Sequence, residues 1–217
     1  MDISKILFID IETVPQKSRY AELSEEMKTF WDKKIQREAE QFQKTPEELY
    51  SRAGIYAEFG KIICISAGFI TEKNGEYFFR IKSYYGDDEK LVLEEFAQLL
   101  NNHFFSENHY LCAHNGKEFD FPYLSRRMLI HQIPLPSLLD NAGKKPWEVK
   151  LLDTMEMWKF GDYKNYTGLN LLAYIFGIPS PKDDIDGSQI YSVYYEDGDI
   201  QRIVEYCEKD TLTVAQL

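Results

Sequence analysis

The sequence predicts an α/β domain with a central mixed sheet that is flanked by helices. Two observations carry this prediction. Three strand-like segments follow one another early in the chain, as in an antiparallel meander, and a helical segment then leads to a fourth strand. Because a helical crossover normally joins parallel strands, we expect this fourth strand to extend the meander in parallel.

The first three strands are predicted from apolar runs and turn residues. Residues 5–13 form a short continuous apolar run that becomes acidic at its end, which is typical of a buried strand. Residues 61–70 and 76–85 are predicted to form two more strands. Asn74-Gly75 between them is a strong hairpin signal.

The elements that follow alternate between helix and strand. Residues 89–104 carry apolar side chains at helical spacing, with Asp87 or Asp88 as the N-cap. Residues 109–113 are predicted to form the fourth strand, and a helix is expected over 119–131. Two further apolar-periodic helices are expected at 169–176 and 199–216, the first ending at Gly177 and Pro179. This order of elements is the ribonuclease H-like arrangement, in which ligands favour the carboxyl ends of strands.

Residues 16–60 interrupt this plan and predict a helical insertion between the first two strands. Ser24 is an N-cap with acids in the first turn, and apolar residues then recur at helical spacing. Thr45-Pro46-Glu47-Glu48 has the form of a capping box, so a second short helix is expected, ending at Gly54. Two roles remain open. The insertion is either a lid that presents Lys33, Lys34 and Arg37 to nucleic acid, or a packing or dimerisation element that uses Phe30 and Trp31. We favour a structural role with partial cover of the site.

Composition limits the class of protein. A chain of 217 residues with 44% hydrophobic content suits one domain over residues 1–217. No apolar stretch approaches the length of a membrane span, and no signal peptide is evident. The three cysteines form no CxxC pair, so we expect buried reduced thiols in a cytoplasmic protein.

The net charge of −11 argues against extended binding of duplex nucleic acid through its phosphates. It does not argue against a site that holds a few nucleotides at a chain end, because bound cations reverse the local sign of such a site.

Five residues spread along the chain stand out as a candidate site. Asp10 and Glu12 are two apart in an extended segment, so their side chains share a face. Tyr206 and Asp210 are four apart on a predicted helix and also share a face. Asp120 opens another predicted helix. Each feature alone is common, but their joint occurrence in this order predicts four converging carboxylates. Such a cluster repels itself unless divalent cations bind, and with cations it can hydrolyse phosphodiesters.

The motifs around these residues resemble a known superfamily. The segments DIE, NGxxFD and YxxxD are similar to the three exonuclease motifs of the DEDD superfamily. Tyr206 resembles the tyrosine-bearing branch (DEDDy), because the sister branch has a His where this chain has Glu205. The closest likeness is to predicted 3′–5′ exonucleases related to the proofreading domain of family B DNA polymerases. It covers the chain apart from the insertion.

This resemblance implies roles for the five residues. Asp10, Glu12 and Asp210 would hold a first Mg²⁺ or Mn²⁺, while Asp10 and Asp120 would support a second. Such ions prefer oxygen ligands. Tyr206 would position the attacking water. With an ordinary pKa near 10, its phenol is better suited to orienting the water than to taking its proton. The product would be a nucleoside 5′-monophosphate.

Substrate contacts are also implied by the resemblance. Asn115 and Phe119 would lie beside the terminal nucleotide, with Phe119 stacking on a base or, alternatively, packing in the core. Thr13 and the backbone of Ile11 would contact the terminal sugar. Asp153 ends an apolar run and is expected to cap the helix that follows, with an additional acid near the site as the alternative.

The sequence is compatible with three functions. A 3′–5′ exonuclease acting on single-stranded ends, with DNA preferred, is the leading hypothesis. An exoribonuclease on the same fold is the second, because the acids and metals would be the same. A non-catalytic nucleic-acid-binding module is the third, although such a module would be expected to have lost an acid. A role in proofreading or repair would require a partner protein, and the sequence names none.

Overall fold

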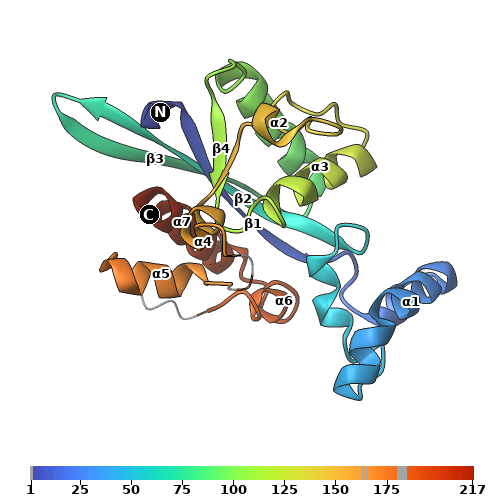
Figure 1. Cartoon of the computed structure of the whole chain (residues 1–217). Helices are drawn as coiled ribbons and strands as arrows, with labels where there is room; N and C mark the ends of the chain where they lie inside the picture. Colours follow the sequence, from blue (N-terminus) through green and yellow to red (C-terminus); the bar gives the residue numbers. More distant parts are fainter. Residues whose placement is uncertain (1, 163, 165, 180–184) are drawn as a thin grey trace.

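A five-stranded mixed sheet forms the centre of the computed structural model, which describes residues 2–162, 164, 166–179 and 185–217 (Figure 1). The strand order is β3-β2-β1-β4-β5. Neighbours β1–β2 and β2–β3 are antiparallel, whereas β1–β4 and β4–β5 are parallel. The predicted meander with a parallel extension is therefore confirmed. The strands are β1 Ile6–Pro15, β2 Gly60–Lys73, β3 Glu76–Tyr85, β4 Tyr110–Ala113 and β5 Leu151–Asp153.

Helices cover both faces of this sheet (Figure 1). The α2 and α3 helices pack on one face, and α7 packs on the other. Asp88 and Asp199 cap α2 and α7 by accepting backbone N–H bonds. The α-helices are α1 Glu25–Phe42, α2 Glu89–His103, α3 Asp120–Ile130, α4 Thr154–Lys159, α5 Leu169–Phe176, α6 Ile190–Ser192 and α7 Ile200–Gln216. Shorter turns are the 3-10 helices η1 Ile3–Lys5, η2 Tyr20–Glu22, η3 Tyr50–Ile55 and η4 Pro146–Glu148, and the π-helix η5 Val193–Asp197. No helix of the described residues is long and apolar enough to cross a membrane.

Strand β1 contributes alternately to the two cores. Leu7, Ile9 and Ile11 belong to the larger core under α2 and α3. The residues between them face the opposite side, where Val14 packs with residues of α7. Because strand side chains alternate between faces, Asp10 falls on the α7 side, as does Glu12. Two carboxylates thus occupy one otherwise apolar face of a buried strand.

The insertion is helical, as expected, but its second half differs from the prediction. Ser24 caps α1 by accepting from the Met27 N–H, and the Thr45–Glu48 capping box forms. The chain then makes a turn and enters the 3-10 helix η3. It does not continue as an α-helix, and Gly54 lies inside η3 instead of ending a helix. The insertion has its own small core around fully buried Trp31, as the packing hypothesis expects, whereas Phe30 is 59% exposed.

A buried ion pair fixes α3 against the rest of the fold. Arg127 of α3 donates from Nε and Nη2 to both carboxylate oxygens of Glu89, and its Nη1 donates to the Ala57 carbonyl at 2.9 Å. Glu89 also accepts the Ile62 N–H of β2 at 2.7 Å. Both charges are more than nine-tenths buried and fully hydrogen-bonded, which is the condition under which a buried pair is tolerated. This pair sets the position of the helix that Asp120 begins.

Candidate active site

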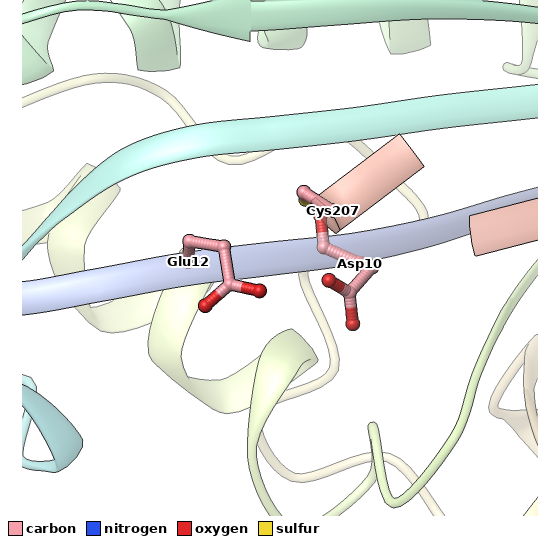
Figure 2. Close-up of side chains that lie close together, drawn as sticks. All are labelled: Asp10, Glu12 and Cys207. Carbon is pink, nitrogen blue, oxygen red and sulfur yellow. Dashed lines mark hydrogen bonds between the residues drawn. The ribbon is translucent and has the colours of Figure 1, made fainter. Parts of the chain in front are cut away.

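Asp10 and Glu12 lie on the same side of β1, as predicted from their spacing. Figure 2 shows both carboxylates projecting to one side of the strand. Ligand atoms of Asp10, Glu12 and Cys207 all lie within 4.8 Å of one another. The β1–β2 register shifts between Glu12 and Thr13, since Glu12 pairs with Cys64 but Thr13 pairs with Ile62. Bulges of this kind are frequent beside active sites because they re-aim side chains.

Asp120 reaches the same cluster from the start of α3. Its side chain is 3% exposed, and its carboxylate accepts a hydrogen bond from the Ile11 N–H. This bond joins the first and second motifs across more than a hundred residues. Coulombic repulsion between Asp120 and both acids of β1 contributes to raising the pKa values of Asp10 and Glu12.

Tyr206 and Asp210 complete the cluster from α7. The two side chains share a helix face and are hydrogen-bonded to each other. Asp210 also acts electrostatically on Asp10 and Glu12. Burial, followed by the charge of Asp210, raises the pKa of the Tyr206 phenol well above its ordinary value. The phenol is therefore protonated at neutral pH, which suits a hydrogen-bond donor and not a base.

The cluster is electrostatically strained without a cation. Burial, and then the neighbouring carboxylates, raise the pKa values of Asp10 and Glu12 well above the ordinary range. Burial raises the pKa of Asp120 to about 7. The Oδ2 atom of Asp10 is buried and has no hydrogen-bond partner among the described residues. An unpartnered carboxylate oxygen amid three other acids fits a divalent cation with oxygen ligands, such as Mg²⁺ or Mn²⁺.

Cys207 lies in this cluster but does not have the character of a ligand. Its Sγ donates to the Asp10 carbonyl at 3.4 Å, and burial raises the pKa of its thiol. A protonated thiol is a poor ligand for Mg²⁺ or Mn²⁺. Cys64, Cys112 and Cys207 are free and buried, which confirms the expectation of reduced core thiols.

Asp153 organises the loop that precedes Asp120. It caps α4 by accepting the Met155 and Glu156 N–H groups, as predicted. Its two oxygens also accept the Asn115 N–H at 2.9 Å and the Lys117 N–H at 3.1 Å. The sequence contained no signal for these two bonds, because the partners are nearly forty residues away. Asp153 acts near the site mainly by holding this loop.

Asn115 occupies a special backbone position within that loop. Its φ of 59° lies in the left-handed region, which Asn tolerates better than most residues. Its Oδ1 is buried and has no partner among the described residues. The side chain therefore retains an unused acceptor in the loop that leads to Asp120.

A groove of about 670 Å³ runs alongside Glu12. Three of the predicted substrate contacts line it, namely Ile11, Thr13 and Phe119, whereas Asn115 does not. The Ile11 side chain belongs to the core, and the Phe119 ring packs 5.4 Å from the ring of Tyr123. Phe121 and Tyr123 are both buried in the core. The other lining residues come from the insertion and from the segment before η5: Ser51, Arg52, Gly54, Ile55, Gly187, Ser188, Ile190, Tyr191 and Ser192.

One comparison with known proteins agrees with this geometry. Residues 55–215 match the model of one family, described as a predicted 3′–5′ exonuclease related to the exonuclease domain of PolB. A comparison with curated proteins gave no match. The matched segment contains Asp120, Tyr206 and Asp210, and it covers well over half of the chain. The chain therefore belongs to the family of predicted 3′–5′ exonucleases related to the exonuclease domain of PolB.

Proposed function

We propose that the protein is a two-metal-ion 3′–5′ exonuclease of the tyrosine branch that removes nucleoside 5′-monophosphates from single-stranded ends. The observation that carries this proposal is the convergence of four carboxylates from β1, α3 and α7 around the unpartnered Oδ2 of Asp10. Family membership supports nuclease activity, and the acidic cluster supports dependence on divalent cations.

We assign metal binding to the four carboxylates and orientation of the attacking water to Tyr206. Asp10, Glu12 and Asp210 would hold one Mg²⁺ or Mn²⁺, and Asp10 with Asp120 would hold the second. When bound, such ions generate a hydroxide nucleophile and neutralise charge on the leaving oxygen. Tyr206, kept protonated by its surroundings, would donate a hydrogen bond that orients the attacking water.

The terminal nucleotide would lie in the groove beside Glu12. Thr13 and the backbone of Ile11 would face its sugar, and Phe119 would stack on its base, a contact that tolerates any sequence. Asn115 would contribute its unused Oδ1 from the neighbouring loop. We propose DNA as the preferred substrate, with RNA as the alternative.

A direct assay tests the proposal. Single-stranded DNA and RNA of equal sequence, labelled at the 5′ end, are incubated with Mg²⁺, Mn²⁺ or EDTA, beside an Asp210→Ala control. We expect a ladder that shortens from the 3′ end and disappears with EDTA or in the variant. The faster strand identifies the preferred substrate. Equal ladders from the variant and the wild type would overturn the assignment.

A further inference from the structure

The insertion forms one wall of the groove beside Glu12. Ser51, Arg52 and Ile55 of η3 line this wall, and Ser188 and Tyr191, from the segment before η5, line the same groove. The family match begins at residue 55, so Ser51 and Arg52 lie outside the matched segment. All three wall residues belong to the insertion, and Ile55 also lies in the matched segment.

The wall is fixed directly to the strand that carries Asp10 and Glu12. A Cβ placed on Gly54 would lie 3.0 Å from the Cα and carbonyl carbon of Val14, so η3 packs against the backbone of β1. The Tyr123 hydroxyl of α3 donates to the Gly54 carbonyl at 2.7 Å. The position of η3 is thus tied to both β1 and α3, which carry three of the four acids.

Arg52 is the charged residue of this wall. Its Nη2 lies 3.0 Å from Glu38 Oε2, and its guanidinium is 5.7 Å from the centre of the Phe42 ring. Glu38 is itself held by the Tyr56 hydroxyl at 2.9 Å. The Arg52 side chain nevertheless remains 44% exposed. A guanidinium has five N–H donors, so this arrangement orients it and leaves donors available to a ligand.

The negative charge around the groove would repel a phosphate backbone, so a cationic side chain in the groove favours binding of a strand. The protein carries a net charge of −11, and Glu12 lines the groove. Among the groove-lining residues that the structure describes, Arg52 alone has a cationic side chain. Lys33, Lys34 and Arg37, which the sequence suggested as contacts, do not line it, and Lys34 packs 4.6 Å from the Tyr56 ring centre.

We propose that Arg52 binds a backbone phosphate of the single strand and that the insertion thereby sets the affinity for strand ends. This inference rests on the proposed nuclease function. Arg suits the role because its planar fork matches phosphate geometry. The insertion then acts as a fixed binding wall, and the ion pair with Glu38 holds the guanidinium in place for the strand.

Strand binding measured without hydrolysis tests this inference. A 5′-fluorescein-labelled single-stranded DNA octamer is titrated by anisotropy, with Ca²⁺ in place of Mg²⁺, across a series of NaCl concentrations. Arg52→Gln should weaken binding by about tenfold at low salt, the size expected for one charge-assisted hydrogen bond. It should also flatten the salt dependence by about one phosphate contact. Arg37→Gln on α1 makes the same charge change away from the groove and should bind as the wild type does.

The Glu38→Gln variant distinguishes phosphate binding by Arg52 from a purely structural role of the Arg52–Glu38 ion pair. It keeps a side-chain oxygen that can accept from Arg52 and removes only the negative charge, so binding should stay within about twofold of wild type or become tighter. Equal losses in Arg52→Gln and Glu38→Gln would show that the ion pair only supports the wall, and would overturn the inference. Wild-type affinity and salt dependence in Arg52→Gln would also overturn it, as would a wild type that binds no strand. Because the ladder assay reports hydrolysis separately, an intact ladder with no Arg52 effect would reject this inference and leave the nuclease function standing.

Discussion

The Asp153 carboxylate at the end of β5 accepts the backbone N–H of Asn115 at 2.9 Å, which fixes the loop before α3 from the neighbouring parallel strand. The same carboxylate accepts three further N–H groups and is 3% exposed. A buried charge with this many donors supports the site without facing the groove.

Removal of the Asp153 carboxylate should lower both the stability and the activity of the protein. Asp153→Ala leaves four backbone N–H groups without their acceptor, so we expect a loss of about 3 kcal/mol in the free energy of unfolding. Nuclease turnover should fall as well, because the loop before Asp120 loses its anchor. Urea unfolding and the ladder assay measure the two effects. Asp140→Ala, at an exposed position, is the control. A stability within about 0.5 kcal/mol of wild type would show that the loop is held by other contacts.

The repulsion within the acidic cluster predicts opposite effects on activity and stability. Asp10→Asn keeps the shape of the side chain but removes a charge from among three other carboxylates. Metal-dependent hydrolysis should fall by more than about 100-fold, which exceeds the loss typical for residues that only hydrogen-bond to metal ligands. The melting temperature in EDTA should rise, because the remaining acids repel less. A lower melting temperature in EDTA would contradict the electrostatic account of the cluster.

The pH dependence of stability follows from Asp120. Its pKa is raised from the ordinary 3.8 to about 7 in the folded chain, so the folded state holds a proton that the unfolded state releases. Its contribution to the stability of the metal-free protein is therefore complete below pH 4 and is lost as pH rises towards 7. Mg²⁺ should stabilise the protein more at pH 8 than at pH 5, where protons compete with it.

Thermal unfolding from pH 4 to 8, with EDTA or Mg²⁺, measures this effect. Asp120→Asn cannot titrate and should flatten the metal-free profile over this window. A metal-free stability that rises between pH 4 and 7 in the wild type, with no change in the variant, would contradict the assignment.

Tyr206→Phe tests the role of the phenol. The ring remains, so packing on α7 should be unchanged, but the hydrogen bond to Asp210 and the donor to water are lost. We expect turnover to fall about 100-fold, the cost of a misplaced reactant, with little change in Mg²⁺ affinity. Single-turnover rates and a metal titration separate the two quantities. Unchanged turnover would reduce Tyr206 to a packing residue.

Gly54→Ala tests the contact between the insertion and β1. The new methyl group would approach the Val14 backbone at 3.0 Å, and backbone cannot move aside easily. We expect a loss of about 1–3 kcal/mol in stability, together with weaker strand binding as η3 shifts. Gly168→Ala is the matched control, because its Cβ would meet one atom at an ordinary 3.9 Å. Equal free energies of unfolding of the two variants would mean that η3 accommodates the methyl group without a loss of stability.

The sequence by itself determined the elements whose patterns are long enough to show a period. Strand β3 spans the predicted 76–85, and α5 spans the predicted 169–176. The shared faces of Asp10 with Glu12 and of Tyr206 with Asp210 also followed from local spacing. These predictions depend on backbone geometry within a few residues, and tertiary contacts did not change them.

Some local predictions were overruled by packing. The capping box at Thr45 formed, but the indole of Trp31 donates to the Pro46 carbonyl at 2.8 Å. That carbonyl would accept the Tyr50 N–H in an α-helix, and Tyr50 bonds to Glu47 instead, in the tighter 3-10 pattern. Strand β5 has three residues, too few to show a period, and exists because β4 is beside it.

The groove and its support were decided by the tertiary structure alone. Arg52 and Tyr191 line the same groove although they are far apart in the chain. Asp153 and Asn115 meet because β4 and β5 are parallel neighbours. Side-chain type and spacing identify residues that can bind a cation. Which residues face one another across a groove depends on how the sheet order and the insertion bring separate segments into contact, and that information is not contained in any local pattern.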